Sequence, residues 1–250
     1  AGVKNFMFLI KSNDLFVILR NTILYNLVFI VLGMVVSVGL AIMISLMRNK
    51  RASKVYQTMM FFPYFMSWVV ASYFLDAFLN QNNGLINNML RNSGQQPIQW
   101  YMTAGAWPAI LTFMYLWKST GYNMVIYLSS ISGIDTTLYE AAVMDGANKR
   151  QQVFHITLPC LKNVIIMMFI LNVGKIFYSD FGLFYQLSQG ARGSIFKTTA
   201  TIDTYIYNAL RSSTIGMTSA AAFFQSVACC ITIILANAIV KKFDEDSAII

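Results

Sequence analysis

The polar stretch 139–159, which reads YEAAVMDGANKRQQVFHITLP, lies between long apolar segments and carries residue types suited to docking another protein. Thr137 and Glu140 have the spacing of a capping box, which predicts the start of a short helix. Gly146 predicts a break after this helix. Two short helices joined at an elbow would offer a partner groove an apolar side edged with charge.

The second short helix of this elbow is expected from Asn148 to Ile156. It should stop at Leu158–Pro159, before the next apolar segment, because proline cannot donate a backbone hydrogen bond inside a helix. A simpler interpretation also fits: Glu140 only completes a capping box and Gly146 only ends a helix.

Other chemistry is largely excluded by what the chain lacks. Its single histidine, His155, cannot build a two-histidine metal site or a His-Glu-x-x-His motif, and no phosphate-binding glycine loop is present. One histidine within a polar loop also argues against a hydrolase triad. Three cysteines with apolar neighbours suggest packing without a disulfide framework: Cys160, Cys229 and Cys230. We expect no catalytic residue and no metal.

Ionisable residues inside the apolar segments are functional candidates by default: Asp76, Lys118, Lys175 and Asp180. On an ideal helix Asn172, Lys175 and Ser179 share one stripe, and Lys118 and Tyr122 form an i, i+4 pair. Candidates for a substrate pathway are Trp68, Tyr73, Trp117, Lys118, Tyr122, Asn172 and Lys175. The aromatic members have an alternative role in the interfacial belt of a membrane protein.

The elements that must position these residues are membrane helices. Hydrophobic residues make up 57% of the chain and charged residues 11%, whereas soluble domains carry about 25% charged residues. Five segments could cross a hydrocarbon core that needs roughly 20 apolar residues: 22–47, 57–79, 105–128, 161–185 and 216–240. The predicted fold class is all-α, a polytopic membrane protein with five transmembrane helices.

Basic residues predict the orientation, because they gather on the cytoplasmic side. Arg48, Lys50, Arg51 and Lys54 follow the first segment, and Lys241 and Lys242 close the last. Alternation then places the loop inside the cell and the N-terminus outside, so a sixth span is expected upstream. The predicted organisation is an extracytoplasmic segment 1–21, a permease domain 22–240 with a coupling loop 134–160, and a cytoplasmic tail 241–250.

The whole pattern around the loop resembles the inner-membrane permease subunits of binding-protein-dependent ATP-binding cassette (ABC) importers. Glu-Ala-Ala, Asp-Gly-Ala and the later Phe154, Ile156 and Leu158–Pro159 match their cytoplasmic signature at fixed spacing. The approach Ile131-Ser-Gly-Ile-Asp135 and the Phe62–Pro63 pair resemble the carbohydrate branch, closest to permeases for oligosaccharides and polysaccharide fragments. The chain departs at Asn163, where a second proline is common, and lacks the first span of the family.

The resemblance implies that this loop couples the chain to an ATPase. Its site would comprise Glu140, Ala141, Ala142, Asp145, Gly146 and Ala147, with Glu140 contacting the ATPase, Gly146 permitting the elbow and Asp145 bracing the turn. The implied partners are a dimer of cytoplasmic ABC ATPases, a homologous or identical second permease, an extracytoplasmic sugar-binding protein and the carbohydrate. The chain itself would need no cofactor, because ATP and magnesium bind to the ATPase.

The resulting hypothesis is a sugar transport permease in the bacterial inner (plasma) membrane that is not an enzyme by itself. Two rival classes stay open. An ion-coupled secondary transporter or channel would use Lys118, Lys175 and Asp180 as a relay. A membrane scaffold would transport nothing, and an ATPase dependent on this chain would argue against both rivals.

Overall fold

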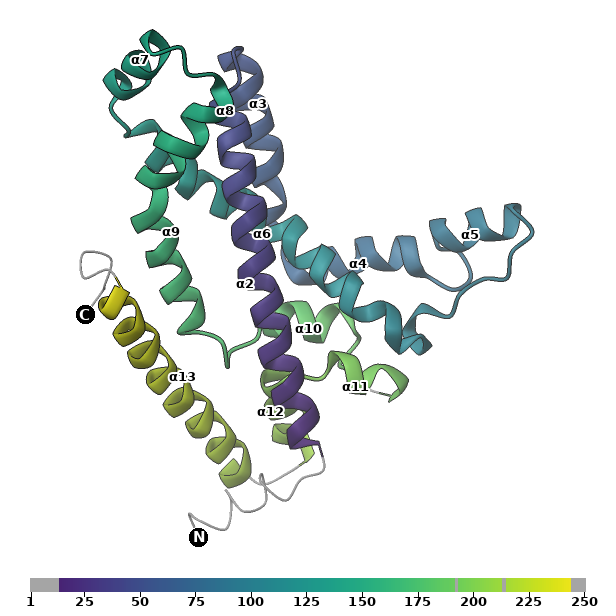
Figure 1. The fold of residues 1–250 in the computed structure, drawn as a ribbon. Helices are drawn as coiled ribbons and strands as arrows, with labels where there is room; N and C mark the ends of the chain where they lie inside the picture. Colours follow the sequence, from purple (N-terminus) through teal and green to yellow (C-terminus); the bar gives the residue numbers. More distant parts are fainter. Residues whose placement is uncertain (1–13, 192, 213–214, 244–250) are drawn as a thin grey trace. The chain divides into compact units, whose positions relative to one another are not determined.

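The helices of the computed structural model confirm the all-α fold class (Figure 1). It describes residues 14–191, 193–212 and 215–243. The α-helices are α2 (Leu15–Ser45), α3 (Lys50–Phe61), α4 (Trp68–Leu79), α5 (Leu85–Asn92), α6 (Trp107–Ser132), α7 (Thr136–Met144), α8 (Lys149–Gln152), α9 (Leu158–Val173), α10 (Phe181–Leu187), α11 (Phe196–Thr199), α12 (Ile202–Ser212) and α13 (Ile215–Phe243). A π-helical turn, Val153–Thr157, joins α8 to α9.

The chain forms two compact units, and several long helices contribute to both. The first unit contains Ala1–Val28, Met66–Tyr115 and Gly174–Thr232. The second contains Phe29–Phe65, Leu116–Val173 and Ile233–Ile250. The predicted coupling loop therefore lies wholly in the second unit.

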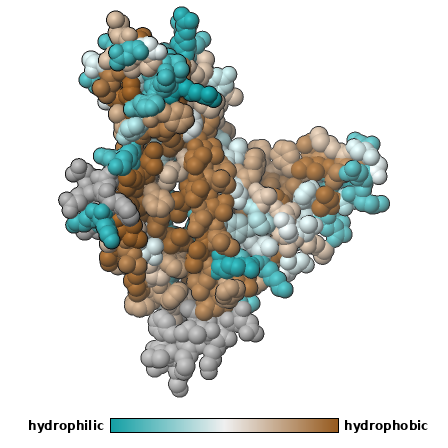
Figure 2. Space-filling view, viewed as in Figure 1, coloured by the Kyte–Doolittle hydropathy of each residue, from teal (hydrophilic) through white to brown (hydrophobic). Residues whose placement is uncertain are grey.

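Within the described residues, three helical stretches are long and apolar enough to cross a membrane: Leu15–Ser45, Lys149–Val173 and Thr218–Lys242. A fourth candidate consists of Lys50–Phe65 and Trp68–Leu79, a bent pair. The 26-residue α6 is longer than the predicted span 105–128 but does not meet the same criterion. Figure 2 shows hydrophobic side chains along α2 and α9 and hydrophilic ones at the end that carries α7 and α8.

The predicted span 57–79 is wrong as one continuous helix. α3 ends at Phe61 and is followed by a 3₁₀ turn, Phe62–Phe65, with Pro63 buried in it. Pro63 has no backbone N–H to continue the ladder. Ser67 then begins α4, because its hydroxyl accepts a hydrogen bond from the Val70 backbone N–H at 3.2 Å.

The predicted span 161–185 is also wrong in its second half, because α9 ends at Val173. Side chains distant in sequence bind the backbone that follows. The Asn26 amide donates to the carbonyls of Ile176 and Tyr178, both at 2.8 Å, and the Gln225 amide donates to that of Phe177 at 2.7 Å. These bonds satisfy backbone groups that a continued helix would have paired.

At the other boundaries the differences are smaller. α2 starts at Leu15, inside the predicted segment 1–21, and α13 extends to Phe243, into the predicted tail 241–250. Residues 1–13 of that segment and 244–250 of the tail lie outside the described residues.

The core of the second unit packs α2, α6 and α9 together. Its buried residues are Val38, Ala41, Ile44, Met124, Tyr127, Ile131 and Leu161. α3 approaches α6 at Gly121, where a Cβ atom would lie 1.9 Å from the backbone oxygen of Met60. Only glycine fits this contact, because a backbone oxygen cannot rotate aside as a flexible side chain can.

We therefore expect Gly121→Ala to destabilise the protein by about 1–3 kcal/mol, the usual cost of overpacking. Thermal unfolding of the purified protein measures the effect as a lower transition temperature. Gly39→Ala on α2 is the matched control, because no atom lies within 4 Å of its added Cβ and alanine favours a helix over glycine. Equal transition temperatures for both variants would show that α3 and α6 tolerate a wider separation.

Candidate functional site

The first helix of the predicted coupling loop, α7, begins at a cap that differs from the predicted one. Asp135 is the N-cap, and its carboxylate accepts a hydrogen bond from the Thr137 backbone N–H at 2.9 Å. The predicted Thr137–Glu140 capping box is therefore wrong. Hydrogen bonds from Thr137 hold the pKa of Asp135 below its usual value of 3.8. The larger effect comes from the backbone N–H of Thr137 and the smaller from its side chain. The capping contribution is present above that value and is lost as the pH falls through the lower folded pKa.

The backbone geometry just after α7 explains why position 146 is a glycine. Gly146 has φ of +80°, a left-handed conformation that residues with a Cβ rarely adopt. Its N–H donates to the Val143 carbonyl at 3.0 Å, and the Ala147 N–H donates to the Ala142 carbonyl at 2.8 Å. This pair of bonds is a Schellman motif, with Asp145 as C-cap. Gly146 thus fixes the direction in which the chain leaves α7.

A capping box does occur in the loop, one turn later. The Asn148 side chain accepts from the Gln151 backbone N–H at 3.0 Å, and the Gln151 side chain accepts from the Asn148 backbone N–H at 2.7 Å. α8 then continues through the π turn into α9 as one 25-residue stretch, Lys149–Val173. The predicted stop at Leu158–Pro159 is wrong, because the π turn accommodates Pro159: the Leu158 N–H bonds to the Val153 carbonyl, five residues back.

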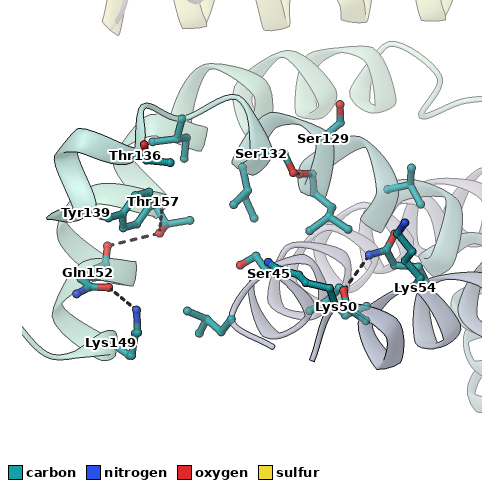
Figure 3. A pocket seen from close by; sticks show the side chains of 18 residues that line it. Ser45, Lys50, Lys54, Ser129, Ser132, Thr136, Tyr139, Lys149, Gln152 and Thr157 are labelled. Atoms are coloured by element: carbon teal, nitrogen blue, oxygen red, sulfur yellow. Dashed lines mark hydrogen bonds between the residues drawn. The ribbon is translucent and has the colours of Figure 1, made fainter. Parts of the chain in front are cut away.

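Two buried polar residues hold α7 and the chain after it against this continuous helix (Figure 3). Tyr139 on α7 shares a hydrogen bond of 2.9 Å with the hydroxyl of Thr157 in the π turn. The Gln152 amide donates to the Ala147 carbonyl at 3.1 Å and accepts from the Lys149 ammonium at 3.1 Å. Gln152 and Thr157 are each 3% exposed. The loop is therefore braced on a helix that is long and apolar enough to span a membrane.

The outer surface of α7 has no cover from the described chain. Of the predicted coupling residues, Glu140, Ala141, Asp145 and Gly146 are exposed, whereas Ala142 and Ala147 are half-buried. α7 also exposes large apolar side chains: Leu138, Val143 and Met144, the last with 86% of its surface accessible. The structure brings the six predicted residues together on α7 and the turn that follows it, which have an amphipathic outer face.

Of the predicted pathway residues, Lys118 and Tyr122 lie together in the second unit. The Lys118 ammonium donates to the Tyr64 backbone carbonyl at 2.7 Å and lies 5.4 Å from the centroid of the Tyr64 ring. The Tyr64 and Tyr122 rings stack at 4.5 Å, and each side chain is about 40% exposed. We call Tyr64, Lys118 and Tyr122 the tyrosine–lysine cluster. Trp117, which precedes Lys118, is half-buried.

Trp68 belongs to the first unit, where it serves packing. Its indole N–H donates to the Asp180 carboxylate at 2.7 Å, and a Cβ at Gly182 would lie 2.2 Å from its ring. Asp180 is also the N-cap of α10, accepting from the Leu183 N–H. Tyr73 on α4 is 72% exposed.

The predicted stripe of Asn172, Lys175 and Ser179 does not exist, because the helix ends between the first two residues. The Asn172 amide bonds back to the Met168 carbonyl at 2.7 Å. Ser179 donates its hydroxyl and its backbone N–H to the Asp203 carboxylate, both at 2.7 Å. Lys175 lies in the turn between them.

Sequence reasoning missed the residues that brace the loop. The signal for Asp135 was present, since aspartate before Thr-Thr is a common helix start. The Tyr139–Thr157 and Gln152–Ala147 contacts leave no sequence signal, because they depend on how α7 folds back.

In the part of the chain that the structure describes, no group of three His, Cys, Asp or Glu residues could hold a metal ion.

Comparison with known proteins identifies the architecture. The family described as "Binding-protein-dependent transport system inner membrane component" matches residues 33–245. The chain belongs to this family. As a permease of this family it is a membrane protein, in agreement with its apolar helices.

Named relatives and solved structures extend the match over nearly the whole permease. The polygalacturonan/rhamnogalacturonan transport system permease protein YteP of Bacillus subtilis is 30% identical over 98% of this chain and 76% of its own length. The lactose transport system permease protein LacF of Rhizobium radiobacter is 32% identical over 76% of this chain and 63% of its own length. The crystal structure of a bacterial ABC transporter that imports the acidic polysaccharide alginate contains a similar chain, with a TM-score of 0.91, 27% identity, and coverage of 98% of this permease and 85% of that chain.

The geometry of Gly146 predicts the outcome of a paired substitution. Gly146→Val forces a β-branched residue to φ of +80°, which costs about 1–3 kcal/mol and redirects the chain between α7 and α8. Ala147→Val adds similar bulk without this strain. We expect Gly146→Val to speed hydrogen–deuterium exchange in 136–148 far more than Ala147→Val does, as measured by mass spectrometry. Equal exchange in the two variants would leave Gly146 as a simple helix terminator.

Proposed function

We propose that this permease forms one half of the translocation pathway of an ABC importer that carries an oligosaccharide or polysaccharide fragment across the bacterial inner membrane into the cytoplasm. The observation that carries the proposal is α7, a short helix exposed on its outer face and braced on its inner side to a membrane-spanning helix. Family membership supports the same function.

The coupling role follows from rigidity. An ATPase can move membrane helices only through an element that does not yield when it is pushed. The Tyr139–Thr157 bond connects α7 directly to the stretch Lys149–Val173, and the buried Gln152 holds the chain just after α7, at Ala147, to the same stretch. A displacement of α7 is therefore passed to a full membrane span, with Glu140 and Met144 on the exposed side that meets the ATPase.

The partners follow from the class of transporter. A dimer of cytoplasmic ABC ATPases binds magnesium and ATP and hydrolyses the ATP, a second permease completes the pathway, and an extracytoplasmic binding protein delivers the sugar. The alginate importer is also known in complex with an alginate pentasaccharide-bound periplasmic protein. In this arrangement the permease carries no catalytic residue of its own.

Two of the similar proteins favour an acidic saccharide as the cargo, because YteP is named for polygalacturonan and the matching structure for alginate, whereas LacF is named for the neutral sugar lactose. The tyrosine–lysine cluster fits such a cargo: stacked rings offer a flat apolar face to a sugar, and an ammonium group offers charge to a carboxylate. Ion-coupled transport through Lys118, Lys175 and Asp180 has weaker support, since Asp180 is held by Trp68 and by its capping role.

Glu140→Ala tests the coupling role. The substitution replaces an exposed residue in mid-helix by the best helix former, so the permease should stay folded while the amount of copurified ABC ATPase and the vesicle uptake of labelled oligogalacturonides or alginate oligosaccharides fall at least tenfold. Arg150→Ala on α8 is the control for loss of one exposed charge in the same loop. Wild-type uptake by the Glu140→Ala vesicles would refute the role.

The tyrosine–lysine cluster is tested by two substitutions at one position. Tyr122→Phe keeps the ring and should keep wild-type uptake kinetics. Tyr122→Ala removes a stacking interaction of about 0.5–1.5 kcal/mol and should raise the KM for saccharide roughly two- to tenfold. Uptake by the two variants at a series of saccharide concentrations separates KM from the maximal rate. An unchanged KM in Tyr122→Ala would remove the cluster from the pathway.

A further inference from the structure

A cavity of about 590 Å³ lies beside the coupling loop, wholly within the second unit (Figure 3). It is bounded by the end of α2, by α3, by the end of α6, and by α7, α8 and the π turn. The transport mechanism described above does not use it.

The walls of this cavity are amphipathic. One part is apolar and includes Ile44, Leu46, Val125, Leu128 and Ile134. The rest is polar, with Lys50 and Lys54 on α3 and Lys149 from α8 as the charged members. No aspartate or glutamate lines it. Three ammonium groups around one cavity without a carboxylate create a site for an anion.

No interaction within the described chain explains why α3 carries two lysines beside this cavity. Neither the Lys50 nor the Lys54 ammonium group makes a hydrogen bond or ion pair within the described chain, and both side chains are exposed. The nearby carboxylate of Asp135 is committed to the cap of α7. Lys50 also stands in the first turn of α3, where a positive charge opposes the helix dipole. Helix stability therefore does not explain its presence.

Hydroxyl donors complete the polar side. Ser129 and Thr136 line the cavity, and their hydroxyl groups make no hydrogen bond within the described chain. Figure 3 shows Thr136 on the side of the cavity that carries Tyr139 and Lys149, and Ser129 on the opposite side with Lys50 and Lys54. Ammonium and hydroxyl groups that line one cavity from several elements are donors that match the oxygens of a phosphate group.

We propose that this cavity binds a phosphate-bearing group, and that the headgroup of an anionic phospholipid of the cytoplasmic leaflet supplies it. A free phosphate ester would need only the lysines and hydroxyls. A lipid also needs apolar surface for its glycerol and upper acyl chains, which the other wall provides. The cavity lies where α2 and α6 end and the basic residues gather, as expected for the membrane surface.

A lipid in this position would link α3 to the coupling loop, because Tyr139, Lys149 and Gln152 belong both to the cavity and to the brace of α7. Anionic lipid would thereby stiffen the element through which the ATPase acts. This consequence rests on the proposed function, whereas the binding itself does not.

The test measures lipid binding to the full chain alone, without any partner. Native mass spectrometry of the detergent-solubilised protein, titrated with phosphatidylglycerol or phosphatidylcholine, gives the affinity for each lipid. Lys50→Gln/Lys54→Gln should weaken phosphatidylglycerol binding roughly thirtyfold, as expected for two lysines near an anionic headgroup. Lys50→Gln removes a charge that opposes the dipole of α3, and Lys54 is exposed in its second turn, so the unfolding temperature should not fall.

The matched control is Lys241→Gln/Lys242→Gln at the end of α13, two exposed lysines that do not line the cavity. It should keep wild-type affinity for phosphatidylglycerol.

Competition with excess glycerol 1-phosphate distinguishes the two sources of the phosphate group. No displacement of lipid supports the lipid headgroup, and displacement supports a phosphate site that takes a soluble ester. Equal weakening in both double variants, or none in either, would overturn the site. In a separate experiment with the ABC ATPase coexpressed, loss of ATPase copurification by Lys50→Gln/Lys54→Gln, with unchanged lipid binding to the chain alone, would also overturn it and assign the cavity to an acidic segment of the ATPase.

Discussion

The need to satisfy every backbone polar group within the protein governs where this membrane chain can break its helices. At the helix breaks described above, side chains form hydrogen bonds with backbone groups that the helices leave unpaired. Ser67 caps α4 after the turn at Pro63, and Asp180 caps α10. Between α9 and α10 the side chains of Asn26 and Gln225 bind three consecutive carbonyl groups. These polar residues therefore have a structural role at the helix breaks.

Close backbone contact is the second requirement, since helices of similar apolar character gain little from hydrophobic burial against each other in lipid. Gly121 lets α6 touch the backbone of α3, and Gly182 accommodates the ring of Trp68. Each contact lies within one of the two units. The glycines thus set the packing inside each unit, while α2, α6 and α13 contribute residues to both.

The proposed coupling loop combines an exposed face with a fixed inner side. Its caps, at Asp135, Gly146 and Asn148, satisfy the backbone at both ends of α7 and at the start of α8. The nine-residue α7 would not persist alone. Tyr139 and Gln152 join α7 and the chain after it to the long stretch Lys149–Val173. The same brace closes one side of the basic cavity, so a partner on the outer face and an anion inside would act on one rigid element.

The sequence alone determined the fold class, the approximate spans 22–47 and 216–240, and the loop with Glu140 and Gly146, because these depend on hydropathy and on local turn chemistry. The tertiary structure decided the rest. The break after Val173 depends on Asn26 and Gln225, more than 45 residues away in either direction. The passage of a helix through Pro159 depends on a π turn. The basic cavity exists only because α3 and α8, far apart in sequence, meet around it. Local patterns cannot encode such contacts, since each requires the whole unit to fold first.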